Sequence, residues 1–168
     1  ITGGIAAFKA ASIASQLRKS GAEVKCIMTA HATELITPLT LREISGNPVA
    51  VSMFEDVPEF NVEHIALARW ADVLVIAPAT ANIIGKIANG IADDMLTTTL
   101  LACQCPRIIA PAMNTRMYEN PITQDNLRLL EHYGFTIIEP ASGLLACGDS
   151  GKGKFPDEGL ILDRKSVV

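Results

Sequence analysis

The sequence predicts an α/β fold in which helices cover both faces of a doubly wound parallel sheet, a Rossmann-like or flavodoxin-like three-layer arrangement. Short apolar runs alternate along the chain with longer segments of helical periodicity. The clearest run, residues 73–77, is apolar at every position, as expected of a strand that is buried on both faces. Four such strands with helices between them predict right-handed crossovers and one parallel sheet.

Composition fits a single domain spanning residues 1–168. The chain is 49% hydrophobic and 19% charged, with a net charge of -4, so it can bury a sizeable core and lacks the basic excess typical of nucleic-acid binding. No apolar run reaches the roughly 18 residues of a membrane span. The four cysteines show neither a disulfide framework nor zinc-site spacing. We therefore expect a cytoplasmic protein without a metal site and without nucleic-acid or membrane partners.

A glycine pair, Gly3 and Gly4, opens a helical pattern that stops at Gly21. The apolar face of this helix would contain Ile5, Phe8, Ile13 and Leu17. A glycine pair at a helix start has the form of a phosphate cradle, because free N–H groups and the positive end of the helix dipole point at the anion. The strand that usually precedes such a cradle is absent, and we expect residues before Ile1 to form it. The alternative is a glycine turn without a ligand.

Residues 22–28 predict the next strand, with Thr29 at its carboxyl end and a helical segment that is broken near Pro38. Thr29 could donate a hydrogen bond to a phosphate or to a ribityl hydroxyl, or it could only cap the next helix. Residues 46–60 contain two prolines in a stretch of mixed polarity. They predict a loop or a short edge strand rather than a linker between domains.

The turn after the 73–77 strand is the candidate ligand site. Pro78 is expected to end the strand, and a helical pattern from Asn82 places Ile83, Ile84, Ile87 and Ile91 on one side. A corner of small residues lets backbone N–H groups approach a ligand, and open parallel sheets bind ligands at the carboxyl ends of their strands. The polar residues that follow, Asp93, Asp94 and Thr97 to Thr99, fit helix capping or a subunit contact.

Two polar residues flank this corner in the sequence. His64 precedes the central strand, and a lone histidine is more often structural, although an imidazole near a pocket is the commonest general base near pH 7. Asn114 follows the strand predicted over 107–110, where its amide could bind a carboxylate or could only stabilise a turn. The next helix is expected to begin at Pro121 and to end at Gly134.

The last predicted strand, residues 135–139, leads into a glycine-rich segment over about 141–156. We expect this segment to be a flexible lid that closes over a ligand. Cys147 lies in it, and could donate a proton to a developing carbanion or be incidental. Cys103 and Cys105 are expected to pack at a helix end.

These residues alone indicate a nucleotide or flavin mononucleotide binder with an acid–base site. NAD is disfavoured because the glycines do not form G-x-G-x-x-G, and because no acidic residue ends the 22–28 strand to hold a ribose. The fold by itself does not fix the function.

Four ordered blocks carry a resemblance to a known family: TGGIAAFKA, HIALARWADVLVIAPATANIIGKIANGIADDMLTTTL, PAMNTRMY and ACGDSGKGK. Together they resemble the flavin-containing cysteine decarboxylases over residues 2–156, most closely the branch that acts on phosphopantothenoylcysteine in coenzyme A biosynthesis. The resemblance implies an FMN-dependent carboxy-lyase that produces phosphopantetheine. It also implies that a phosphopantothenate–cysteine ligase domain could follow in the native chain, because the similar bacterial and archaeal proteins are bifunctional.

The resemblance also implies roles for individual residues. FMN would be held by the glycine-pair segment, by the corner and by single residues after two other strands, namely Gly3, Gly4, Ile5, Ala6, Thr29, Pro78, Ala79, Thr80, Ala81, Asn82 and Ala112. His64 would be the active-site base, Asn114 would bind the substrate carboxylate, and Cys147 would donate a proton. Further substrate contacts would come from Asn114, Met117, Ala146 and Lys152.

The family's chemistry explains why these residue types are needed. A cysteine carboxylate has no electron sink for the carbanion left by loss of carbon dioxide, whereas transient oxidation of the thiol-bearing carbon to a thioaldehyde supplies one. His64 would assist the initial deprotonation, and Cys147 would protonate the enethiol as hydride returns, so that no net oxidation results. Thr80 and Tyr118 stand where the family often has Ser and Trp, and neither change removes a group used in this chemistry.

Family members form trimers, sometimes assembled into dodecamers, with FMN at a subunit boundary. The resemblance therefore implies a homo-oligomer, and Arg69, beside Trp70, is a candidate interface residue or a solvated helix end. Competing interpretations are a peptidyl-cysteine decarboxylase, a flavin prenyltransferase and a non-catalytic relative that regulates a phosphatase. The joint presence of His64, Asn114 and Cys147 argues against the last of these.

Overall fold

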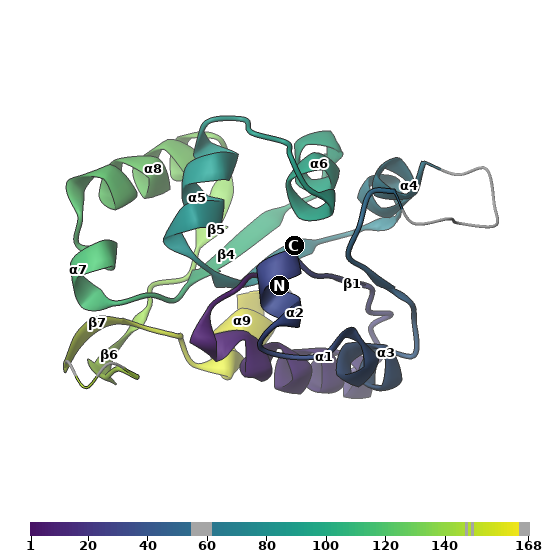
Figure 1. Cartoon of the computed structure of the whole chain (residues 1–168), viewed down its shortest axis with the longest axis horizontal. Coiled ribbons are helices and arrows are strands. Elements are labelled where there is room, and N and C mark those ends of the chain that lie inside the picture. Colours follow the sequence, from purple (N-terminus) through teal and green to yellow (C-terminus); the bar gives the residue numbers. More distant parts are fainter. Residues whose placement is uncertain (55–61, 147, 149, 165–168) are drawn as a thin grey trace.

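The computed structural model describes residues 1–54, 62–146, 148 and 150–164, and its helices lie on both sides of the strands (Figure 1). The strands are β1 (Cys26–Ile27), β2 (Val49–Ala50), β3 (Leu74–Ala79), β4 (Arg107–Pro111), β5 (Phe135–Ile137), β6 (Ala141–Leu144) and β7 (Ser150–Lys154). The helices are η1 (Ile5–Phe8), α1 (Lys9–Lys19), α2 (Ala30–Thr33), α3 (Pro38–Ser45), α4 (Glu63–Trp70), α5 (Ala81–Ala88), α6 (Met95–Ala102), α7 (Thr115–Tyr118), α8 (Pro121–His132) and α9 (Glu158–Arg164). This arrangement confirms the predicted three-layer α/β class.

The parallel strands fall into two groups among the described residues. β3, β4 and β5 pair in that order, and β1 pairs with β2. Both groups are parallel, as predicted, and within the described part of the chain β1 and β3 do not pair with each other. β6 and β7 form an antiparallel hairpin within the segment predicted as a flexible lid.

The core lies on both faces of the β3–β4–β5 group, since successive side chains of a strand point to opposite faces. One face packs against α5, α6 and α8 through a cluster that includes Ile76, Ile84, Leu100, Ile109, Leu127 and Leu130. The other face packs against α1 and α9 through Ile13, Ala77, Ile108, Ala110 and Ile161. Burial on both faces explains why the strands read as continuous apolar runs.

β3 is longer than the sequence suggests, because Pro78 does not end it. The strand continues to Ala79, and its pairing with β4 shifts register between Ile76 and Ala79. Proline lacks the N–H that a regular ladder would use, which makes such an irregularity the natural place for it. The corner therefore begins at Thr80.

Helix boundaries follow the predicted caps around α8. Asn120 accepts a hydrogen bond from the Ile122 amide at 2.9 Å, Pro121 is the first residue of the helix, and Gly134 has a φ of 80° just after its end. Such a positive φ favours glycine. Pro38 similarly begins α3, which explains the predicted break.

The polar run after α5 has a structural role. Asp94 and Thr97 form a capping box at the start of α6, and Asp93 pairs with Lys86 at 2.8 Å. The hydrogen bond from Lys86 lowers the pKa of Asp93. Helix capping, one of the two interpretations of this run, is thus confirmed.

Three expectations about apolar residues are wrong. Ile5 and Phe8 are exposed, at 66% and 61%, and Ile91 lies outside α5 at 47% exposure.

The strand predicted over 22–28 is paired only at Cys26–Ile27. Residues 46–60, predicted as a loop or a short edge strand, contain the short strand β2, and residues 55–60 lie outside the described part of the chain.

Within the described part of the chain, no helix is long and apolar enough to cross a bilayer. In the same part, no group of three or more His, Cys, Asp or Glu side chains is placed to hold a metal ion.

Candidate active site

Thr2 joins the glycine pair to the corner after β3. Its side chain is buried, its hydroxyl donates to the Pro78 carbonyl at 2.7 Å, and it accepts from the Thr80 amide at 3.2 Å. On the other side, the Thr29 amide donates to the Ile1 carbonyl at 3.0 Å. Residues 1–2 thus hold the carboxyl ends of β1 and β3 together. The sequence analysis missed Thr2, and only its place before the glycine pair could have drawn attention to it.

The glycine pair is closely surrounded. A Cβ on Gly4 would lie 3.3 Å from Cγ2 of Thr80 and 4.0 Å from the Ala112 carbonyl oxygen, and a Cβ on Gly3 would lie 2.5 Å from Cβ of His31. A side chain at Gly3 would clash with His31 and one at Gly4 would crowd Thr80, so the backbone can approach these residues only because both positions are glycine. The Ala112 amide also donates to the Ala79 carbonyl at 3.0 Å, so the ends of β3 and β4 meet at this point.

The corner itself is a capped helix start. The Thr80 hydroxyl accepts from the Ile83 amide at 3.4 Å at the N-terminus of α5. Pro78 and Ala79 are buried, whereas Asn82 is exposed. Thr29 occupies the N-cap position of α2, but its side chain makes no capping hydrogen bond. Thr29 is therefore not explained by capping, which was the alternative to a ligand contact.

An open groove runs between α5 and the α7–α8 segment. It brings together three of the predicted site residues, Ala81, Asn82 and Met117, with side chains that include Lys86, Asn120 and Asn126. Met117 is 50% exposed. The groove therefore adjoins the corner and the Asn114 turn.

Asn114 begins α7 as its N-cap. Its side chain accepts a hydrogen bond from the Arg116 amide at 2.9 Å, which fixes the orientation of the side chain after β4. The turn role predicted for Asn114 is confirmed. Its binding of a substrate carboxylate stays a prediction.

β7 lies directly on the backbone of the Asn114 turn. The Met113 amide donates to the Gly153 carbonyl at 2.9 Å. A Cβ on Gly151 would lie 2.5 Å from Oγ1 of Thr115, so the contact requires glycine. The two glycines place the hairpin against the predicted substrate site, and this contact, between parts distant in sequence, was not foreseen.

Lys152 is held by its neighbours in the hairpin region. Its Nζ forms an ion pair with Oε2 of Glu139 and lies 5.5 Å from the centre of the Tyr118 ring. The Tyr118 hydroxyl donates to the same Glu139 oxygen at 3.3 Å. The hydrogen bond to Glu139 raises the pKa of Lys152, and burial raises the pKa of Tyr118. The contacts of Lys152 and Tyr118 with Glu139 therefore hold β7 near the end of β5.

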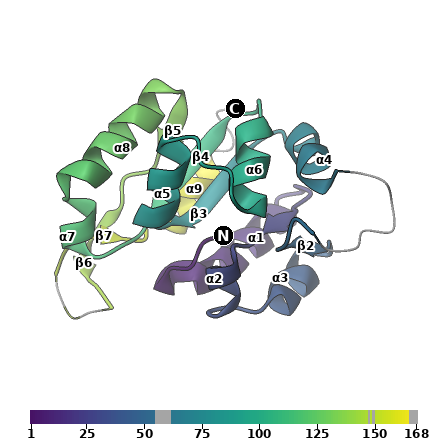
Figure 2. The same ribbon diagram turned by 45° about the horizontal axis from the view of Figure 1, so that its top comes forward.

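His64 lies apart from Asn114, the other predicted catalytic residue that the structure describes. It is a half-buried residue in the first turn of α4, and Figures 1 and 2 show α4 and α7 at opposite ends of the molecule. A single chain therefore does not bring His64 to Asn114. Arg69 is exposed on the same helix, and the Trp70 ring lies 4.4 Å from Nζ of Lys25.

The structure describes Cys103 and Cys105 but not Cys147. Cys147 lies outside the described residues, and Ala146 before it is exposed. Cys103 is buried after α6, with its Sγ 3.0 Å from Sγ of Cys105. Burial, followed by the Cys103 thiol, raises the pKa of Cys105 to about 12. The predicted packing role of this pair is confirmed.

Comparison with known proteins places this arrangement in a family. A sequence model described as "Flavoprotein" matches residues 1–165. The chain belongs to the Flavoprotein family. It is 48% identical over 162 residues to the coenzyme A biosynthesis bifunctional protein CoaBC of Bacillus subtilis, covering 96% of this chain and 40% of that protein. It is 47% identical over 167 residues to a probable phosphopantothenoylcysteine decarboxylase of Streptococcus mutans, covering 98% of this chain and 93% of that protein.

The chain is also similar to solved structures over nearly its whole length. A PPC decarboxylase variant complexed with pantothenoylaminoethenethiol has a TM-score of 0.86 and 35% identity, covering 99% of this chain and 93% of that one. The FMN binding protein AtHal3 has a TM-score of 0.83 and 36% identity, covering 99% and 91%. The chain thus spans about two fifths of the bifunctional relative and nearly all of the shorter ones.

Proposed function

We propose that this chain is an FMN-dependent phosphopantothenoylcysteine decarboxylase of coenzyme A biosynthesis. The observation that carries the proposal is the likeness, over nearly the whole chain, to a probable decarboxylase of that name and to a PPC decarboxylase structure with pantothenoylaminoethenethiol. Pantothenoylaminoethenethiol is an enethiol, the kind of product that oxidative loss of the carboxylate would leave. The site geometry described above supplies independent support.

The residues around the glycine pair fit a flavin phosphate. Gly3 and Gly4 pack too closely on His31 and Thr80 to carry a side chain without a shift. The backbone then enters η1 and α1, where N–H groups favour an anion. Thr29 and Thr80 would border the bound group, and the remaining contacts would come from Ile5, Ala6, Pro78, Ala79, Ala81, Asn82 and Ala112. When bound, FMN would supply the reversible two-electron chemistry that no side chain can provide.

The protein's own groups would orient the substrate and move protons. Asn114, held by its hydrogen bond to the Arg116 amide, would bind the substrate carboxylate without adding a charge. Lys152 would offer a cation to the substrate from the hairpin. Cys147 would donate the proton that completes the product, and Met117 and Ala146 would contact the substrate.

His64 would act from a neighbouring subunit. Because α4 and α7 lie at opposite ends of one chain (Figure 2), a complete set of catalytic residues needs a second copy. Ile5 and Phe8, which are exposed beside the glycine pair, give the apolar surface that such a copy would cover. A homotrimer, alone or within a dodecamer, would place His64 of one subunit near Asn114 of the next. A fused phosphopantothenate–cysteine ligase, as suggested by the bifunctional relative, would be a further partner.

The decisive experiment measures carbon dioxide release from phosphopantothenoylcysteine by the purified protein reconstituted with FMN. Expected results are FMN-dependent release and formation of phosphopantetheine. A peptide ending in cysteine serves as the competing substrate. Turnover of the peptide alone would reject the proposed substrate, and no turnover of either would reject the activity.

A further inference from the structure

Two thiols face each other in the turn between α6 and β4. Cys103 follows α6 as its C-cap, and Cys105 lies two residues later, just before Pro106. Their sulfur atoms are 3.0 Å apart, so both side chains point to the same side of the turn. A disulfide has a sulfur–sulfur distance of about 2.05 Å, which these atoms would reach by approaching about 1 Å. We call these two residues the Cys103–Cys105 pair.

The two thiols differ in their access to solvent. Cys103 is buried, whereas Cys105 is half-buried, so a reagent from solution meets Cys105 first. Burial, followed by the Cys103 thiol, raises the pKa of Cys105 to about 12. Its first reaction is therefore slow near neutral pH, because the thiolate is the nucleophile. Once Cys105 has reacted, Cys103 lies in position to attack it.

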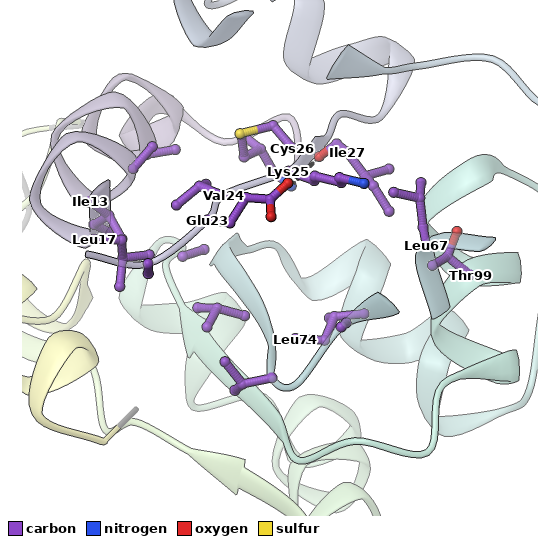
Figure 3. Close-up of a pocket in the computed structure, with 18 of the residues that line it drawn as sticks. Ile13, Leu17, Glu23, Val24, Lys25, Cys26, Ile27, Leu67, Leu74 and Thr99 are labelled. Carbon is purple, nitrogen blue, oxygen red and sulfur yellow. Dashed lines mark hydrogen bonds between the residues drawn. The ribbon is translucent and has the colours of Figure 1, made fainter. Parts of the chain in front are cut away.

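Cys103 also contacts α4. Its thiol donates a weak hydrogen bond to the Ala68 carbonyl at 3.8 Å, in the last turn of that helix, where carbonyls lack partners within the helix. Figure 3 shows Leu67, the residue before Ala68, next to Thr99, which lies one turn before Cys103 on α6. The Cys103 thiol can donate to the end of α4 only while it is reduced, because a disulfide sulfur carries no proton.

We infer that the Cys103–Cys105 pair is a reversible thiol–disulfide site, which small organic disulfides oxidise and thiols reduce. In the oxidising direction, the Cys105 thiolate attacks one sulfur of the reagent. The other half of the reagent leaves as a thiolate and takes up the proton that Cys105 lost. Cys103 then attacks the Cys105 sulfur of this mixed disulfide. The Cys103–Cys105 bond forms, the second half of the reagent leaves with the Cys103 proton, and two electrons have passed from the protein to the reagent.

The short loop between the two cysteines favours a reversible bond over a structural one. A disulfide stabilises a protein mainly by constraining the unfolded chain, and more so for longer loops. The loop here contains a single residue, Gln104, between the cysteines, so the bond constrains the unfolded chain little. Its formation instead removes the donor that faces Ala68. Because α4 carries His64, the redox state of the pair acts on the helix that bears a predicted catalytic residue.

The test incubates the purified chain with excess oxidised glutathione at pH 9, where more thiol is ionised than at neutral pH. Mass spectrometry then maps the disulfides. The protein should lose the mass of two hydrogen atoms, one peptide should contain the Cys103–Cys105 bond, and dithiothreitol should restore the original mass. Cys26, a buried thiol in the β1 core cluster, should stay unmodified. The Cys103→Ser variant should instead keep glutathione on Cys105, because no neighbouring thiol remains to displace it.

Hydrogen exchange measured by NMR tests the effect on α4. The Ala71 amide, which donates to Leu67 at the end of α4 at 3.2 Å, should exchange at least twofold faster in the oxidised chain. The Gly46 amide, which donates to Arg42 at the end of α3 at 2.8 Å, is the matched control and should not change. Equal exchange at Ala71 in both redox states would contradict the effect on α4.

Three results of the mass spectrometry would overturn the inference. They are a chain that keeps both thiols free, a wild-type chain that retains glutathione on Cys105, and a disulfide that joins either residue of the pair to Cys26 or Cys147. None of these measurements uses catalytic activity or FMN, so the inference stands or falls separately from the proposed function.

Discussion

The Thr2 hydroxyl donates to the Pro78 carbonyl at 2.7 Å across 76 positions of sequence. The same oxygen accepts from the Thr80 amide. One buried side chain therefore sets the distance between the glycine pair and the corner after β3. The shape of the proposed cofactor site depends on this pair of bonds.

Thr2→Val should destabilise the protein and weaken FMN binding. Valine has nearly the same shape but leaves the Pro78 carbonyl and the Thr80 amide without their partner, at a cost of about 1–3 kcal/mol. Urea unfolding and an FMN titration followed by fluorescence would measure the two effects. Thr2→Ser keeps the hydroxyl and serves as the control. Equal stability of the Val and Ser variants would contradict the assigned role.

Gly3→Ala should impair FMN binding more than Gly4→Ala. A Cβ at Gly3 meets Cβ of His31 at 2.5 Å, whereas the nearest atom to a Cβ at Gly4 is a methyl group of Thr80 at 3.3 Å. Gly85→Ala is the matched control, because its Cβ would make an ordinary contact at 3.6 Å in α5 and alanine favours helix. Unchanged FMN affinity in both cradle variants would show that the cradle does not hold the phosphate.

Mixed oligomers should recover activity from two inactive variants. His64→Asn and Asn114→Asp should each be inactive alone, the second because a carboxylate repels the substrate carboxylate. In randomly mixed ring-shaped oligomers, about one quarter of the sites would combine an intact His64 with an intact Asn114 from a neighbour. Decarboxylation by refolded mixtures is the measurement. No recovery in mixtures whose mixed composition is verified by native mass spectrometry would exclude a shared site.

Cys147→Ser should separate carbon dioxide release from product formation. Without the thiol as proton donor, decarboxylation should proceed while the enethiol accumulates instead of phosphopantetheine. Mass spectrometry of the product and a carbon dioxide assay would detect the split. Cys26→Ser, which changes a thiol of the β1 core cluster, controls for general loss of a cysteine. Normal phosphopantetheine formation by Cys147→Ser would contradict the role of Cys147 as proton donor.

Cys105 should alkylate slowly in the folded protein at pH 8. With a pKa raised to about 12 by burial, its reactive thiolate would be about 10⁻⁴ of the total, and reactivity should rise with pH up to that value. Iodoacetamide labelling under reducing conditions, before and after unfolding in urea, gives the comparison. Similar native and unfolded rates would show that the thiol is not protected.

Local patterns in the sequence predicted the fold class and several boundaries. Asn120 and Pro121 mark the start of α8 correctly because a cap and a first-turn proline act within a few residues. The position of Pro78 within β3 could not be read this way, because a bulge depends on the neighbouring strand. Ile5 and Phe8 fit helical periodicity, yet periodicity cannot distinguish a core face from a surface that another subunit covers.

The site was only partly predictable for the same reason. The glycine pair and the corner are recognisable as segments, but their contact through Thr2 depends on tertiary structure. Gly151 likewise reads as part of a flexible lid, whereas in the structure it allows close contact with Thr115. The separation of His64 from Asn114 follows from the parallel pairing of β3 and β4, because His64 precedes the start of β3 and Asn114 follows the end of β4. Single motifs do not contain this information.

The bond between Met113 and Gly153 limits how the β6–β7 hairpin can move. A hinged hairpin would need to move away from the residues on which it packs. Here, however, β7 and the turn at Asn114 share a backbone hydrogen bond. Substrate entry should therefore leave β7 in place around Gly153. This contact would keep the turn at Asn114 in its shape while a ligand enters and leaves.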